Sequence, residues 1–180
     1  LSSVYQDYVL SLWDPNAIAT SGIDGFMLDE PTFPQWQTSY DTGLLGCYCS
    51  ACQTRYQAMY GTAMPVINLP QDYNTTNFNR VIAFRKTVFT EWMTFLCGHL
   101  RLAGDDFNVS IVLFPNVVSA QFSGYMTAAQ ATSVDVNAVI QLANLDTLSV
   151  DPYWVSWGAN PSWYANFIPQ FTTAPHKQGK

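Results

Sequence analysis

The stretch GIDGFMLDEP, residues 22–31, constrains the fold of this chain more than any other. A short apolar run between glycine and proline is typical of a buried parallel strand rather than of a helix. Pro31 cannot donate a ladder hydrogen bond, so we expect the strand to end there. Asp29 and Glu30 then lie at its carboxyl end, which is the end where parallel α/β folds place their chemistry.

The rest of the chain alternates between helical and extended patterns. We expect helices at residues 3–13, 17–20, 50–60, 79–103, 136–142 and 161–171, and strands at residues 23–29, 109–115 and 147–154. This order predicts an α/β fold with parallel strands and right-handed crossovers. Three such strands can form an open sheet or part of a (β/α)8 barrel. No glycine-rich phosphate loop follows any of them, so nothing favours a nucleotide-binding fold.

Composition and charge narrow the classes of partner. The 180 residues suffice for one domain, and only 11% are charged, against a usual ~25%. The net charge of −6 disfavours a nucleic-acid partner. No apolar run approaches the length of a transmembrane helix, so no membrane partner is expected. Both ends of the sequence look cut, and we therefore expect residues 1–180 to be a single segment of a longer domain.

Glu30 is the main candidate for acid/base chemistry. The chain has only two glutamates, and Glu91 falls on the exposed side of the predicted helix 79–103. A carboxylate beside Asp29 and among apolar residues can have its pKa raised, which suits a general acid/base. The alternative is a structural role for Glu30, as a helix N-cap or in a strand-end salt bridge.

Aromatic and acidic residues near the strand ends favour a sugar ligand. Asp151, Tyr153 and Trp154 close the third predicted strand, and Trp36 lies in the long loop of residues 31–46. A carboxylate can accept hydrogen bonds from sugar hydroxyls while an aromatic ring covers an apolar sugar face. Plain core packing is the competing interpretation for Tyr153 and Trp154. A loop as long as residues 31–46 without secondary structure of its own is usually functional.

Three cysteines cluster at Cys47, Cys49 and Cys52, and we call this CxCxxC motif the cysteine knuckle. The spacing suits a metal better than a disulfide framework. Structural zinc takes four ligands, and a fourth is not evident in this segment because Cys97 is expected to be a buried thiol. A redox role is disfavoured, because an acidic loop rather than a thioredoxin-like strand precedes the motif.

These features together resemble a known family. A strand ending in Asp29-Glu30, a loop, and the cysteine knuckle leading into a helix are similar to the zinc-containing β-galactosidases of glycoside hydrolase family 42 and to related glycosidase-like barrels. The helix with Arg80, Phe84, Arg85 and Trp92, and the strand at residues 145–153, add to the likeness, which covers about residues 22–154.

The resemblance implies part of a (β/α)8 TIM barrel, about strands four to six with their helices. Glu30 would be the acid/base of a retaining O-glycosidase. Asp29 and the four residues named above as sugar contacts would shape the substrate site. The cysteine knuckle would supply three ligands to a structural Zn²⁺, with the fourth upstream. The nucleophile would lie on the strand after Lys180, among the remaining barrel strands of the parent chain, so the segment alone would be inactive.

The chain departs from those galactosidases at Asp29, where they have Asn. Two alternatives remain beside the glycosidase hypothesis. Residues 22–29 also resemble the fourth strand of α-amylase-type barrels, but Met27 stands where that family has Arg, and the second predicted strand lacks a Glu. The alternative function is a non-catalytic carbohydrate-binding or scaffold barrel with a zinc-binding cysteine knuckle.

Overall fold

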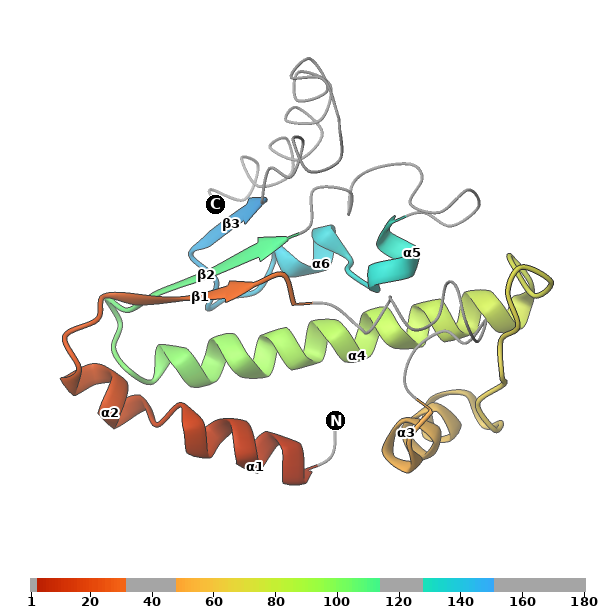
Figure 1. Cartoon of the computed structure of the whole chain (residues 1–180), viewed down its shortest axis with the longest axis horizontal. Coiled ribbons are helices and arrows are strands. Elements are labelled where there is room, and N and C mark those ends of the chain that lie inside the picture. Colours follow the sequence, from red (N-terminus) through yellow and green to blue (C-terminus); the bar gives the residue numbers. More distant parts are fainter. Residues whose placement is uncertain (1–2, 32–47, 114–127, 151–180) are drawn as a thin grey trace, which may run out of the picture.

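The computed structural model describes residues 3–31, 48–113 and 128–150 (Figure 1). These contain the strands β1 (Gly25–Asp29), β2 (Asn108–Leu113) and β3 (Thr147–Val150), and the helices α1 (Ser3–Leu12), α2 (Pro15–Thr20), α3 (Ser50–Tyr60), α4 (Thr76–Arg101), α5 (Ala128–Thr132) and α6 (Val136–Val139). The helix predicted at residues 161–171 lies outside the described ranges. In the described ranges, no helix combines the length and apolarity needed to cross a bilayer.

The three strands form one parallel sheet in the order β1-β2-β3. In its register Leu28 lies opposite Ile111, and Ile111 lies opposite Leu148. Helices α3 and α4 fall between the first two strands in sequence, and α5 and α6 between the second and third. The predicted α/β class with parallel strands is therefore confirmed.

Capping residues explain why two of the observed helices begin earlier than predicted. Helix α2 begins before residue 17 because Asp14 accepts a 3.0 Å hydrogen bond from the Asn16 backbone N–H, and Pro15 occupies the first helical position. Helix α4 begins before residue 79 because the Thr75 hydroxyl accepts from the Phe78 N–H at 3.2 Å. Helix α3 has the predicted bounds, and Gly61 ends it with a φ of 71°.

Helices α4 and α6 cover one face of the sheet. Successive strand residues point to opposite faces, and the strand residues of the first core all lie on the helix-covered face, whereas Val112, which is also buried, lies on the other. This first core contains Leu28, Val109, Ile111, Leu113 and Leu148 from the strands, Phe89, Met93, Leu96, Cys97 and Leu100 from α4, and Val139 with Ile140 at α6. Helices α1 and α2 run along α4 on the side away from the sheet in Figure 1, and Val9 of α1 joins the same core.

Strand β1 is buried on one face only, which corrects the prediction of a fully buried strand. Leu28 is 7% exposed, whereas Met27, on the opposite face, is 59% exposed. The reason is that the helices cover only the face that carries Leu28, and β1 is an edge strand in the described part of the chain. Strand β2 has a neighbour on each side, and its apolar run from Ile111 to Leu113 is buried as predicted.

A second core joins α3 to the N-terminal half of α4. Its buried members are Tyr56, Met64, Ile67, Phe78, Val81, Ile82, Phe84 and Val88, and Tyr48 and Cys52 pack against it. Across the surface of this unit, Arg55 of α3 pairs with Glu91 of α4 at 2.5 Å. Glu91 is exposed, as its place in the sequence predicts.

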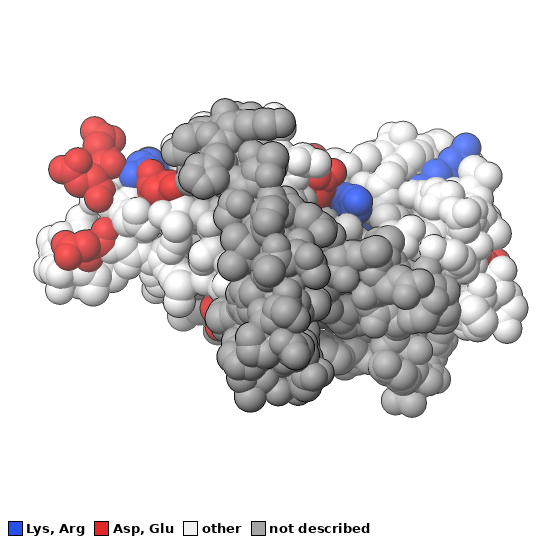
Figure 2. Space-filling model, turned by 90° about the horizontal axis from the view of Figure 1, so that it is seen from above, with Lys and Arg blue, Asp and Glu red and all other residues white. Residues whose placement is uncertain are grey.

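Charged side chains are sparse on the surface. Figure 2 shows that most of the described surface on this face is uncharged, with a few separate acidic and basic groups. No continuous basic area appears among the described residues in that view. The low charged fraction of the composition is thus visible as wide uncharged areas.

Candidate functional site

The carboxyl ends of the three strands meet at one edge of the sheet, because the strands are parallel and in register. Asp29 lies opposite Val112, and Leu113 lies opposite Val150. Figure 1 shows the three arrowheads pointing the same way. Asp29 ends β1 and Glu30 follows it directly, so both carboxylates lie at this edge, as the sequence predicts.

Glu30 leaves the strand through an unusual backbone conformation. Its N–H donates to the Val112 carbonyl at 2.9 Å, which extends the ladder by one bond beyond Asp29. Its φ is 45°, in the left-handed region. That conformation costs a residue with a Cβ roughly 1–2 kcal/mol and is concentrated at functional sites. The side chain is half-buried, and its Oε1 atom is shielded from solvent.

Asp29 has a different environment from Glu30. It points to the sheet face that carries Met27, opposite the helix-covered face, and it is exposed. On that face, the row at the carboxyl edge consists of Asp29, Val112 and Ser149, one residue from each strand. The two neighbouring carboxylates therefore differ in solvent access, as separate roles for an acid/base and a ligand contact would require.

The other predicted sugar contacts fall outside the described residues. These are Trp36, Asp151, Tyr153 and Trp154. Strand β3 is described up to its last residue, Val150. Of the predicted catalytic and sugar-binding residues, the described structure brings together Asp29 and Glu30 alone.

The cysteine knuckle is described at two of its three positions. Cys49 is the N-cap residue of α3 and is exposed, and Cys52, three residues on, is half-buried in the first turn. Two sulfur donors at the start of a helix suit a metal ion, since the positive end of the helix dipole favours negatively charged ligands. Cys47 lies outside the described residues, among which no three His, Cys, Asp or Glu side chains form a metal-binding group.

Cys97 and the described part of the cysteine knuckle belong to different cores. It is fully buried in the first core, whereas Cys52 packs against the second. This matches the prediction that Cys97 is a buried thiol. Zinc binding itself stays a prediction.

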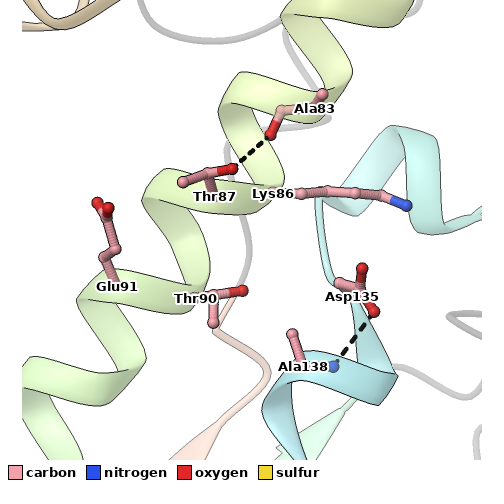
Figure 3. A pocket seen from close by; sticks show the side chains of 7 residues that line it. All are labelled: Ala83, Lys86, Thr87, Thr90, Glu91, Asp135 and Ala138. Atoms are coloured by element: carbon pink, nitrogen blue, oxygen red, sulfur yellow. Dashed lines mark hydrogen bonds between the residues drawn. The ribbon is translucent and has the colours of Figure 1, made fainter. Parts of the chain in front are cut away.

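A groove of about 410 Å³ that the sequence did not predict lies between α4 and α6 (Figure 3). It is lined by Ala83, Lys86, Thr87, Thr90, Glu91, Asp135 and Ala138. The α4 residues recur at helical spacing, which in the sequence looks like an ordinary helix face. Thr87 donates to the Ala83 carbonyl at 3.0 Å, and Asp135 caps α6 by accepting from the Ala138 N–H at 3.3 Å. No strand-end residue lines the groove.

No protein-family model, curated protein or solved structure matches this chain.

Proposed function

We propose that this chain is the central part of a (β/α)8 barrel glycosidase in which Glu30 is the general acid/base. The observation that carries the proposal is the place and conformation of Glu30. It follows the last residue of a parallel strand, its backbone is in the left-handed region, and its Oε1 is shielded from solvent. Strained, partly desolvated carboxylates at the carboxyl ends of parallel strands are typical of catalytic groups.

The sheet topology supports a barrel over a doubly wound fold. The strand order follows the sequence order without reversal, and the crossover helices α4 and α6 share one face of the sheet. A doubly wound sheet has helices on both faces and a point where the strand order reverses, whereas a barrel keeps its helices outside. The exposed face with Met27 would then look into the barrel, where side chains from the remaining strands would cover it.

In the proposed reaction Glu30 acts twice. It first donates its proton to the glycosidic oxygen while a carboxylate nucleophile from another strand attacks the anomeric carbon, so the leaving group departs as an alcohol. It then takes a proton from the water that releases the sugar from the nucleophile, and is protonated again. A retaining mechanism places the two carboxyl groups roughly 5–5.5 Å apart. Asp29 would accept a hydrogen bond from a sugar hydroxyl, with Trp36, Asp151, Tyr153 and Trp154 completing the site.

We further propose that Cys47, Cys49 and Cys52 hold a structural Zn²⁺ with a fourth ligand from outside this segment. The position of Cys49 and Cys52 in the first turn of α3 supports this, because it presents both sulfurs at the same end of the helix. Such an ion would fix the start of α3 against the second core and thereby shape the loop that follows Glu30.

Turnover of aryl glycosides by the complete protein tests the proposal against its rival. Wild-type turnover that is lost in the Glu30→Gln variant supports the acid/base role. Turnover that is unchanged in Glu30→Gln overturns it. A wild-type protein that binds sugars without hydrolysing them would identify the rival function, a non-catalytic carbohydrate-binding barrel.

A further inference from the structure

Two triplets in the sequence have the pattern of an N-glycosylation acceptor, Asn-x-Ser/Thr. They are NTT at residues 74–76 and NVS at residues 108–110. The modification attaches a bulky oligosaccharide to the asparagine side chain, so a folded protein carries it at surface positions. It also needs the hydroxyl group two residues further on. The two triplets offer the same chemistry, and only their structural surroundings distinguish them.

A tight turn directly before α4 carries the first triplet. The Thr75 N–H donates to the Asp72 carbonyl at 3.1 Å, which closes the turn. Asn74 has a φ of 61°, a left-handed conformation that asparagine tolerates better than most residues. The Tyr73 ring packs on Phe78 at 5.2 Å and anchors the turn, while the Asn74 side chain is exposed. Figure 1 shows the segment between α3 and α4 meeting the end of α4 that lies away from the three strands.

The side chain of Asn74 is held through its oxygen, which leaves its nitrogen available. Asn79 Nδ2 donates to Asn74 Oδ1 and to the Asn74 backbone carbonyl, both at 3.3 Å. Asn74 Nδ2 bonds to no described residue, so a sugar on this nitrogen would leave both contacts intact. Thr76 is exposed, and its hydroxyl also has no hydrogen bond within the described ranges. Helix capping is done by Thr75 instead. Both groups that the modification needs are therefore accessible.

The second triplet is part of the sheet. The Asn108 N–H donates to the Asp24 carbonyl at 2.9 Å at the start of β2. Val109, the middle residue, is fully buried in the first core. The Ser110 hydroxyl donates to the Phe26 carbonyl at 3.3 Å, so the required hydroxyl is already engaged. The backbone of this triplet is fixed in a parallel ladder, whereas the first triplet lies in an exposed turn.

We propose that Asn74 accepts an N-linked oligosaccharide and that Asn108 does not. In the transfer, Asn74 Nδ2 bonds to C1 of the first sugar of an oligosaccharide carried on a lipid pyrophosphate. The C1–O bond to the pyrophosphate breaks, the lipid pyrophosphate leaves with the bonding electrons, and one Nδ2 proton passes to water. The glycan would lie away from the carboxyl edge of the sheet (Figure 1). This inference is therefore independent of the roles proposed for Glu30 and the cysteine knuckle.

Secretion of the complete protein from eukaryotic cells, behind an added secretion signal, tests this inference. Mass spectrometry of the peptides before and after enzymatic removal of N-glycans locates any glycan. We expect the wild type to carry one at Asn74. Thr76→Ala should abolish it while leaving Asn74 and the Thr75 helix cap in place, and Thr76→Ser, which keeps a hydroxyl, should retain it. Ser110→Ala is the matched control, because it removes the second triplet in the same way and should leave the glycan unchanged.

Three results would overturn the inference. A secreted wild type without a glycan at Asn74 would show that the turn does not present the triplet to the transferase. A glycan at Asn108 would show that pairing within the sheet does not protect the second triplet. A Thr76→Ser variant that loses the glycan as completely as Thr76→Ala would contradict the role assigned to the Thr76 hydroxyl. None of these results bears on the glycosidase proposal, which keeps its own test.

Discussion

The backbone N–H of Glu30 donates a 2.9 Å hydrogen bond to the carbonyl oxygen of Val112. This bond holds Glu30 to the neighbouring strand at the point where its φ of 45° turns the chain out of the sheet. This hydrogen bond fixes where the chain leaves β1, and the left-handed backbone conformation of Glu30 fixes the direction in which it leaves. The position of the proposed acid/base is therefore set by the sheet itself.

Replacing Glu30 with glycine or alanine separates backbone strain from side-chain chemistry. Both variants lack the carboxylate, but only glycine adopts a φ of 45° without a Cβ clash. We expect Glu30→Gly to be more stable than Glu30→Ala by about 1 kcal/mol in urea unfolding. An alanine variant as stable as the glycine variant would show that the backbone of Glu30 is not strained.

Two glycine-to-alanine substitutions should change stability in opposite directions. A Cβ at Gly25 would lie 2.6 Å from the Asn108 carbonyl oxygen, so Gly25→Ala must push β1 from β2 and should cost about 1–3 kcal/mol. Among the described residues, a Cβ at Gly98 on α4 would meet only Asn144 Nδ2, at 3.6 Å, and alanine favours the helix. Gly98→Ala should therefore stabilise the chain by roughly 0.5–1 kcal/mol. Thermal unfolding of both variants measures these changes in stability. Equal changes for Gly25→Ala and Gly98→Ala would contradict the close pairing of β1 with β2.

Asp146 should matter more for stability than its exposure suggests. Its carboxylate pairs with Arg101 and also accepts a 2.8 Å hydrogen bond from the Val109 N–H, at the amino ends of β2 and β3. Asp146→Ala removes both interactions and should cost about 2 kcal/mol in urea unfolding. Glu91→Ala breaks only the exposed pair with Arg55 and should cost under about 1 kcal/mol. A larger loss of stability for Glu91→Ala than for Asp146→Ala would contradict this stabilising role of Asp146.

Tyr48 should contribute stability that depends on pH. The Ile67 N–H donates to its hydroxyl oxygen at 3.2 Å, so Tyr48→Phe should cost about 1 kcal/mol at neutral pH. Burial raises the pKa of Tyr48 above its ordinary 10.0. The folded state therefore binds the phenol proton more tightly than the unfolded state does, and the contribution of Tyr48 is lost as pH rises through the folded-state pKa.

The difference in unfolding free energy between the wild type and Tyr48→Phe should accordingly be constant up to about pH 10 and shrink at higher pH. Urea unfolding at several alkaline pH values measures it. A difference that stays constant from pH 8 to pH 11 would show that Tyr48 does not titrate differently in the folded and unfolded states.

The sequence predicts the elements well where local signals are strong. Glycine at the end of α3 and the apolar periodicity of α4 are local, and both helices occur where expected. The start of α4 was missed because capping by Thr75 depends on one hydroxyl, which can equally serve a turn. The exposed face of β1 was missed because an apolar run does not say how many faces of a sheet are covered.

The candidate site was predictable only in its position along the chain. Strand direction and the stop at Pro31 place Asp29 and Glu30 at the edge where the structure has them. The positive φ of Glu30 could not be read from the sequence, since glutamate has no preference for that region. The burial of Arg85 was equally hidden, because arginine in a helix is normally exposed.

The dependence of hydrolysis on the leaving group tests the central claim most directly. In the complete protein, we compare Glu30→Ala with the wild type on aryl glycosides whose phenols differ in acidity. A poor leaving group needs a proton from Glu30, so kcat/KM should fall roughly 10²–10⁴-fold. A dinitrophenyl leaving group needs none and should be affected far less. The control variant Asp29→Asn should lower kcat/KM for both kinds of substrate by the same factor. If Glu30→Ala lowers kcat/KM equally for both kinds of substrate, or for neither, the assignment of Glu30 as the acid is contradicted.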